Sequence, residues 1–126
     1  MTTENFDTGS IRDSRGGKGR FDLLSPLVLA RDAKHLETGA AHYGDRNWEK
    51  GQPLSRFMDS ALRHIVKYMA GFRDEDHLAA ARWNLACVMH FETLGNYEDD
   101  LPSYVNPGGN SDEWIKGLLE RVTVSQ

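Results

Sequence analysis

Cysteine is almost missing from this sequence, because Cys87 is the only one in 126 residues. A single cysteine excludes an intrachain disulfide and a cysteine-based zinc site. Long apolar runs are missing too, since no stretch approaches the roughly 20 residues that a membrane-spanning helix needs. The first ten residues, MTTENFDTGS, are polar and contain no apolar signal segment. We therefore expect a protein of a reducing cytoplasm that has no membrane partner.

Positive charge is in deficit, with 15 Lys and Arg against 19 Asp and Glu, a net charge of −4 and an isoelectric point near 5.7. Proteins that bind nucleic acid usually carry a basic face, so we expect no nucleic-acid partner. An excess of carboxylates instead suits a protein that holds a divalent cation. The length fits one domain, of a size at which self-association helps to bury apolar surface.

Apolar residues recur at three- and four-residue spacing in three long segments, which is the pattern of amphipathic helices. No alternating strand pattern of useful length accompanies them. The predicted fold class is therefore all-α, a compact bundle of three main helices plus a short C-terminal helix. Ser25 and Pro26 supply a cap and a first turn for the first helix. The predicted helices run from Pro26 to about Tyr43, from about Leu54 to Ala70, from the acidic triplet 74–76 to Gly95, and from 112 to about 121.

The remaining segments flank or connect these helices. Residues 1–19 have little apolar content and four glycines, which predicts a flexible N-terminal arm. Residues 96–110 form a polar connection rich in proline and glycine, a composition typical of a loop or lid. The predicted organisation is an arm (1–19), an all-α catalytic core (20–95), a loop or lid (96–110) and a C-terminal helix (111–126), assembled as an oligomer.

The turn after the first helix, Gly44–Gly51, carries more functional groups than the end of a helix requires. Gly44 alone is enough to end the helix. Tyr43, Arg46, Asn47 and Trp48 add an aromatic face, a guanidinium and an amide, a set that suits one small ligand. The alternative is a well-packed interhelical loop whose Trp48 caps the core. The residues alone leave both interpretations open.

Carboxylates lie at three places that each have two interpretations. Glu37 lies among small alanines that leave room for a ligand, or it is simply solvated. Asp59 begins a series with Arg63 and Lys67 at four-residue steps, which forms either a solvated ladder of ion pairs or a face turned toward metal and phosphate. The triplet 74–76 complements the dipole of the third helix, but three adjacent carboxylates repel one another. A divalent cation would relieve that repulsion.

Four segments, taken in order, resemble one family: KGRFDLLSP (18–26), HLETGAAHYGDRNWEKG (35–51), SRFMDSALRH (55–64) and RDEDHLAAARWN (73–84). They resemble the phage MazZ-like dATP/dGTP diphosphohydrolases, a branch of the MazG-like all-α NTP pyrophosphohydrolases, over roughly residues 15–93. The resemblance implies cleavage of a purine deoxynucleoside triphosphate, dGTP favoured and dATP the alternative, between the α and β phosphates. It also implies Mg²⁺ or Mn²⁺, a dimer or tetramer, a role in phage nucleotide-pool metabolism, and the cytoplasm of a bacterial host.

With that resemblance, Glu37 and Asp76 are predicted as catalytic carboxylates and metal ligands, helped by Glu75 or Asp59. The ExxE and ExxD pairs of the wider superfamily are incomplete here, since Ala40 stands three residues after Glu37. The other predicted site residues suit phosphate, a purine ring or a base edge. They are Lys18, Arg20, Arg46, Arg63 and Lys67 for phosphate, Tyr43 and Trp48 for stacking, and Asn47 and Asn84 for the base edge.

Two other functions stay open at this stage. A non-catalytic helical nucleotide-binding or adaptor protein of a phage agrees with the incomplete carboxylate pairs. An HD-type triphosphohydrolase would need spaced histidines, whereas Asp76 and His77 have the reverse of the HD order. The products separate these functions: deoxynucleoside monophosphate plus pyrophosphate, deoxynucleoside plus triphosphate, or none.

Overall fold

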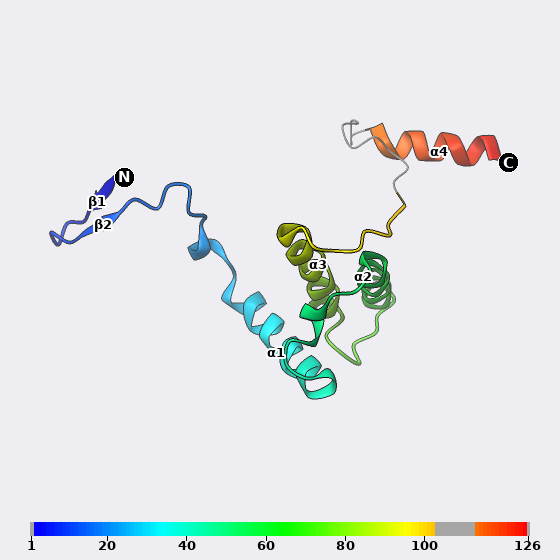
Figure 1. Cartoon of the computed structure of the whole chain (residues 1–126), viewed down its shortest axis with the longest axis horizontal. Coiled ribbons are helices and arrows are strands. Elements are labelled where there is room, and N and C mark those ends of the chain that lie inside the picture. The colour runs from blue at the N-terminus through cyan, green and yellow to red at the C-terminus, as the bar shows by residue number, and fades with distance from the viewer. Residues whose placement is uncertain (1, 103–112, 126) are drawn as a thin grey trace.

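The structure is a computed structural model and describes residues 2–102 and 113–125. Within these residues three long helices and a shorter C-terminal one dominate, which confirms the predicted all-α class (Figure 1). None of the described helices combines the length and apolar character of a membrane span. The elements in chain order are β1 (Thr3–Asn5), β2 (Ile11–Asp13), η1 (Phe21–Leu23), α1 (Pro26–Tyr43), η2 (Asn47–Lys50), α2 (Leu54–Met69), α3 (His77–Leu94) and α4 (Trp114–Ser125).

The helix ends follow from local hydrogen bonding. The Ser25 hydroxyl accepts a hydrogen bond from the Val28 N–H at 3.3 Å, and Pro26 occupies the first turn of α1. The Asp76 carboxylate caps α3 by accepting from the Ala79 N–H at 3.1 Å. Gly95 ends α3 in the left-handed conformation, with φ of 74°. The predicted ends of α1 and α3 are confirmed to within about two residues because these caps are visible in the sequence.

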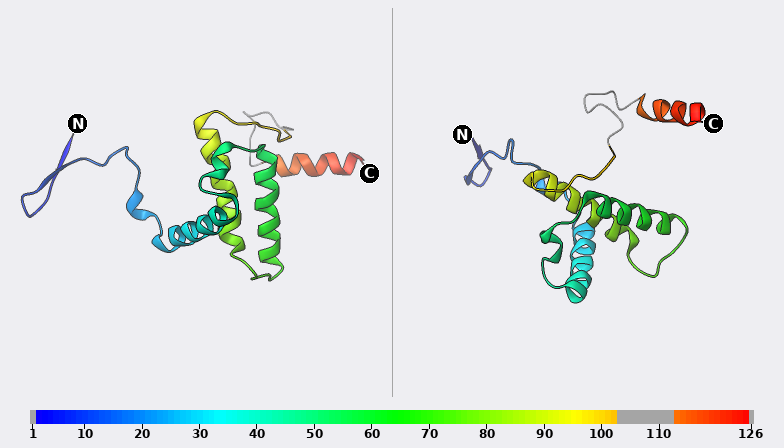
Figure 2. Two further views of the ribbon diagram at one scale, coloured as in Figure 1. Left: turned by 60° about the horizontal axis from the view of Figure 1, so that its bottom comes forward. Right: turned by 45° about the vertical axis from the view of Figure 1, so that its right-hand side comes forward.

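The core lies between α2 and α3, which run side by side in every view (Figures 1 and 2). Leu54 and Phe57 of α2 pack against Cys87 and Phe91 of α3, and all four are buried. Burial raises the pKa of the Cys87 thiol to about 12, so this cysteine is a packing residue and not a nucleophile. Partly buried side chains then extend the core on both sides: Trp48, Trp83, Val88 and Leu101.

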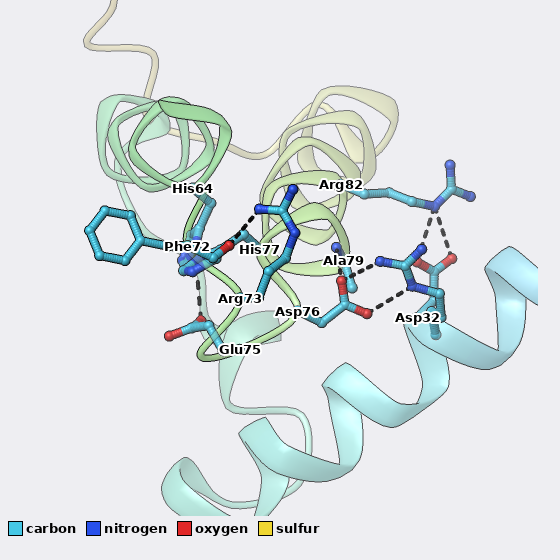
Figure 3. A network of polar contacts seen from close by, with 10 residues as sticks. Asp32, His64, Phe72, Arg73, Glu75, Asp76, His77, Ala79 and Arg82 are labelled. Atoms are coloured by element: carbon cyan, nitrogen blue, oxygen red, sulfur yellow. Dashed lines mark hydrogen bonds and ion pairs between the residues drawn. The ribbon is translucent and has the colours of Figure 1, made fainter. Parts of the chain in front are cut away.

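Helix α1 is attached in a different way, because none of its residues is buried. It contacts α3, and two ion pairs cross that contact (Figure 3). Arg31 of α1 donates from Nε to Asp76 Oδ2 at 2.8 Å and from Nη2 to the other carboxylate oxygen. Asp32 accepts from Arg82 of α3 at 3.0 Å. The position of α1 thus depends on polar contacts more than on apolar burial.

The chain after α3 returns to the start of α2. The Leu54 N–H donates to the carbonyl of Glu98 at 3.0 Å, and the Ser55 N–H donates to the Asp100 carboxylate at 2.9 Å. These contacts satisfy N–H groups that the first turn of any helix leaves unpaired. Residues 96–102 of the predicted loop or lid therefore lie against α2. Residues 103–110 of that prediction lie outside the described part of the chain.

The two ends of the chain lie apart from the α1–α3 core in Figures 1 and 2. Residues 1–19, predicted as a flexible arm, contain an antiparallel hairpin in which Glu4 pairs with Arg12. No alternating pattern predicted this hairpin, because each strand has only three residues. Helix α4 confirms the predicted C-terminal helix, and residues 111–112 at its predicted start lie outside the described residues.

The contacts of Trp48 lead to a stability prediction. Its ring meets Trp83 edge-on at 4.9 Å between centroids and His90 at 4.7 Å, so Trp48→Ala removes packing from the core. Because Trp48 is only partly buried, we expect a loss of about 2–3 kcal/mol in the free energy of unfolding, at or below the low end for buried aromatics. Tyr43→Ala, which removes an exposed ring five residues earlier, should change it by no more than about 0.5 kcal/mol. Urea denaturation measures both, and equal values for the two variants would contradict the core assignment.

Candidate functional site

A pocket lies between α1, the turn that follows it, α2 and the start of α3. Its lining combines three kinds of side chain that are separated in the sequence. Cations come from α1 and the turn, and most aromatic and amide groups come from the turn and α3. Carboxylates and imidazoles come from residues 64–76 and also from α1 and the turn, which contribute His35, His42 and Asp45.

The turn from Gly44 to Gly51 is held in a conformation that few residues adopt. Both glycines have positive φ, 88° and 89°, which favours glycine at each end of the turn. Arg46 lies between them in the left-handed region with φ of 57°, the only non-glycine residue there with positive φ among those described. Such strained positions gather at binding sites. The Arg46 side chain pairs with Glu49, and the turn directs Asn47 and Trp48 to the pocket wall.

The contacts of Trp48 agree with both interpretations that its sequence position allowed. It packs against the core through Trp83 and Phe91, as a capping residue would. It also lines the pocket, as a ligand-binding residue would. Its contacts fix the ring orientation, so any ligand meets a rigid aromatic edge or face.

A row of cationic and polar side chains on α1 forms the opposite wall. Arg31, Lys34 and His35 all line the pocket, followed by Thr38 and His42 further along the same helix. These positions are spaced by three, four and seven residues, so they share one face of α1. The sequence prediction did not include them. The signal was nevertheless present, because RDAKHLETGAAH places basic residues at helical spacing between apolar ones.

Asp76 joins this wall to α3. Two hydrogen bonds from Arg31 hold the pKa of the Asp76 carboxyl at about 2, well below its ordinary value, with the Ala79 N–H contributing. Both carboxylate oxygens are therefore occupied, one by Arg31 Nε and the other by Arg31 Nη2 and the helix cap. Asp76 positions the pocket wall and leaves little capacity for a further ligand while Arg31 is in place.

Next to Asp76, three side chains bring possible metal-binding atoms together: His64, Glu75 and His77 (Figure 3). One donor atom from each lies within 4.8 Å of the others. His77 is 2 % exposed, and its Nε2 contacts the Asp74 carboxylate at 2.8 Å. That contact lowers the pKa of Asp74, while burial lowers the pKa of His64. The sequence analysis included Glu75 but not the two histidines, which are thirteen residues apart and on different helices.

Asn84 lines the same pocket from α3. Its Nδ2 donates to the Ser60 hydroxyl at 3.2 Å and to the carbonyl of Ala80 at 2.8 Å. This satisfies the hydrogen-bonding need that a mid-helix asparagine among apolar neighbours creates. Because both bonds are donated, the Oδ1 atom is the one left to accept from a ligand.

The structure thus divides the predicted site residues. Those that line the pocket are Tyr43, Arg46, Asn47, Trp48, Glu75, Asp76 and Asn84. The others lie outside it and most have partners of their own: Glu37 pairs with Lys34, Asp59 with Arg63, and Arg20 with Asp22, while Lys67 and Lys18 are absent from the lining. The Lys34 contact lowers the pKa of Glu37, whose side chain is 72 % exposed.

The arrangement has a clear chemical capacity. A cationic wall attracts an anion, aromatic rings and an amide accept a planar heterocycle, and a carboxylate with two imidazoles suits a divalent ion. A nucleotide with its metal ion is a ligand that uses all three.

The comparisons with known proteins agree with this capacity. Neither a curated protein nor a solved structure matches the chain. A family model described as "dATP/dGTP diphosphohydrolase, N-terminal" matches residues 8–101, which include α1, α2, α3 and every residue of the pocket. The matched segment is most of the chain, and it confirms both the resemblance and the predicted enzyme class. The chain therefore belongs to the dATP/dGTP diphosphohydrolase family, a family of nucleotide pyrophosphatases.

Proposed function

We propose that the protein hydrolyses a purine deoxynucleoside triphosphate, with dGTP favoured, between the α and β phosphates to give a monophosphate and pyrophosphate. The observation that carries this proposal is the pocket, in which cations, rings and carboxylates converge. The family supports the same reaction class. Hydrolysis of this bond needs the phosphate charge balanced, a water held in line with the α-phosphorus, and the leaving pyrophosphate stabilised.

The cations of the pocket suit the phosphates. Arg31, Lys34 and Arg46 all line it, and each is paired with a carboxylate. Their side chains are between 53 % and 77 % exposed, and exposed ion pairs contribute only about 0–1 kcal/mol. A triphosphate carries more charge than one carboxylate, so it can displace these partners. Arginine then offers a planar fork to two phosphate oxygens, which lysine does not.

Other side chains of the pocket suit the base. Tyr43 is 73 % exposed at the end of α1 and lines the pocket, so its ring can stack on a purine. Asn47 and Asn84 also line the pocket, and their amides can read a base edge. The accepting Oδ1 of Asn84 favours guanine, because the guanine Watson–Crick edge presents N1–H and N2–H donors next to each other. Adenine presents one donor group there.

The proposed cofactor is Mg²⁺ or Mn²⁺, and the residues present fit it. Mg²⁺ commonly uses one or two protein carboxylates together with substrate phosphates and waters. Glu75 lines the pocket, is 53 % exposed and has His64 as its described partner at 3.7 Å, so it is an available carboxylate, with Asp76 beside it and Asp45 elsewhere in the lining. When bound, the ion would screen the phosphate charge and lower the pKa of a bound water. That Glu37 and Asp59 also serve as ligands stays a prediction.

Product analysis tests the reaction. We expect incubation with each of the four dNTPs and Mg²⁺ or Mn²⁺ to give the monophosphate and pyrophosphate in equal amounts, fastest with dGTP, then dATP. Because water attacks the α-phosphorus, heavy-oxygen water should label the monophosphate and leave pyrophosphate unlabelled. Ion-exchange chromatography and mass spectrometry measure both. Release of tripolyphosphate would indicate the HD-type reaction, and label in pyrophosphate would place the attack on the β-phosphorus.

The Tyr43 ring gives a test of the base position. Tyr43→Ala removes a stacking surface worth about 1–3 kcal/mol per base, so the KM for dGTP should rise roughly 10- to 100-fold. The unfolding free energy should stay unchanged because the ring is exposed. Tyr97→Ala is the matched control, since Tyr97 is also partly exposed but does not line the pocket. Equal KM values for the two variants would remove Tyr43 from the site.

We also propose that the chain self-associates through α1, as a dimer or tetramer, and acts on the nucleotide pool of a phage in the cytoplasm of its bacterial host. Support for self-association comes from the apolar side chains that α1 leaves exposed. Leu29 is 44 % and Leu36 36 % exposed, although their spacing of seven residues predicted that they belong to a buried stripe. A second chain that covers them would bury the apolar surface that one chain leaves in water.

Sedimentation equilibrium tests the self-association. The protein should sediment as a dimer or tetramer, and Leu29→Glu should shift it toward the monomer because a carboxylate would have to be buried in the interface. Ile11→Glu is the control, since Ile11 is 64 % exposed on the hairpin, away from α1. A monomeric parent protein, or equal behaviour of both variants, would contradict the proposal.

A further inference from the structure

We propose that His64, Glu75 and His77 form a binding site for one transition-metal ion of the Zn²⁺, Co²⁺ or Mn²⁺ type, occupied without nucleotide. This proposal stands on the geometry of the three side chains and does not require the proposed hydrolysis. It differs from the Mg²⁺ requirement of a substrate complex, because two of its three donors are nitrogen atoms. His64 belongs to α2, Glu75 to the segment that leads into α3, and His77 to the first position of α3 (Figure 3).

The donor atoms are already gathered. His64 Nδ1 and His77 Nδ1 lie 2.9 Å apart, and Glu75 Oε1 lies 3.7 Å from His64 Nδ1. Two nitrogens bound to one tetrahedral ion at about 2.1 Å are about 3.4 Å apart. The two rings must therefore separate by about 0.5 Å to hold the ion. Glu75 is the more exposed donor and can approach by side-chain rotation alone.

Asp74 orients one of the histidines for this role. His77 Nε2 lies 2.8 Å from Asp74 Oδ1, and a carboxylate only accepts, so Nε2 carries the proton. In the neutral ring the lone pair is then on Nδ1, the atom that faces His64. A carboxylate behind a histidine is the usual support of a metal-binding imidazole. His77 is almost completely buried, so the orientation is fixed by packing as well.

The two histidines need no ion to explain their contact, since His64 Nδ1–H can donate to His77 Nδ1. Binding an ion requires only that His64 move this proton to its Nε2, which exchanges one neutral form for the other. The side chain of His64 is 14 % exposed, so water can carry the proton. The hydrogen bond and the metal site therefore use the same two nitrogen atoms, Nδ1 of each histidine.

The charges around the site allow a divalent ion. Glu75 and Asp74 contribute two negative charges at the site. Arg63 and Lys67 on α2 lie close enough to act on His64 and oppose a cation. Arg63 is already paired with Asp59 at 2.6 Å, which offsets part of that opposition. Two imidazoles and one carboxylate favour Zn²⁺, Co²⁺ or Mn²⁺ over Mg²⁺, which prefers oxygen ligands.

The position of the site links it to the pocket. His64 and Glu75 both line the pocket, whereas His77 lies behind them in the core. An ion held by the three would therefore be reached from the pocket side. Open coordination positions on it would face the pocket and not the interior.

Metal binding to the untagged full chain, without nucleotide, tests the proposal. We expect isothermal titration calorimetry to show one Zn²⁺ or Co²⁺ per chain and no measurable heat with Mg²⁺. Bound Co²⁺ should give visible d–d absorption bands of nitrogen and oxygen ligation, and Zn²⁺ should raise the melting temperature. These readouts need no enzymatic activity, so they fail or succeed independently of the proposed hydrolysis.

Three variants locate the ion. His64→Gln and Glu75→Gln each remove a ligand and should weaken Co²⁺ binding by about 100-fold or more. Asp74→Asn leaves the ligands but loosens His77, so it should weaken binding about 10- to 100-fold. Glu92→Gln is the control, since Glu92 is exposed on α3, does not line the pocket and should leave binding unchanged. Circular dichroism checks that each variant folds.

Two results would overturn the site. If the parent protein takes up neither Zn²⁺ nor Co²⁺ in a one-to-one ratio, the histidines form a plain hydrogen bond. If His64→Gln and Glu75→Gln bind Co²⁺ as the parent does, the ion lies elsewhere.

Discussion

The position of α1 depends on the carboxylate of Asp76. This one side chain caps α3 through the Ala79 N–H and accepts two hydrogen bonds from Arg31 of α1. With the Asp32–Arg82 pair beside it, it fixes the angle at which α1 crosses α3. Since α1 buries no residue, removing Asp76 would loosen one wall of the pocket as well as one helix end. The pocket is therefore a product of an ion pair as much as of a hydrophobic core.

The core itself serves a different purpose. Phe57, Cys87 and Phe91 hold α2 and α3 together, and Trp48 anchors the turn to them. Because the turn is anchored, Asn47 and Arg46 are presented from a rigid support to the space that α1 closes. The site thus combines a rigid wall, formed by α2, α3 and the turn, with a polar wall whose charged groups can exchange partners.

Much of the fold was predictable from the sequence, and the reasons are local. Ser25 with Pro26, Asp76 and Gly95 mark helix ends by short-range hydrogen bonding and backbone preference. The turn was recognised because ending the helix requires only Gly44 and not the functional groups that follow it. These features act within a few residues of one another, which is the range over which a sequence can be read directly.

The site was predictable only in part, because its other members meet through tertiary contacts. His64 and His77 are on different helices and thirteen residues apart, so no local pattern predicted that they would meet. Glu37 was attractive for its small neighbours, but its carboxylate faces Lys34 on the same helix. The partner of Asp76 is 45 residues away, a contact that no local pattern reveals. The direction in which a helix face points is set by packing, and the sequence does not contain it explicitly.

Because α1 is attached by polar contacts, its contacts form and break at different times from those between α2 and α3. Helices α2 and α3 are neighbours in the chain and bury the core between them, so their contacts form early and open only when the core unfolds. The ion pairs of α1 span 45 and 50 residues and are partly exposed, so they form late and break first. Amide hydrogens of α1 then exchange with solvent by local detachment, while those of α2 and α3 wait for global unfolding. Added salt, which screens these exposed ion pairs, would make α1 detach more often.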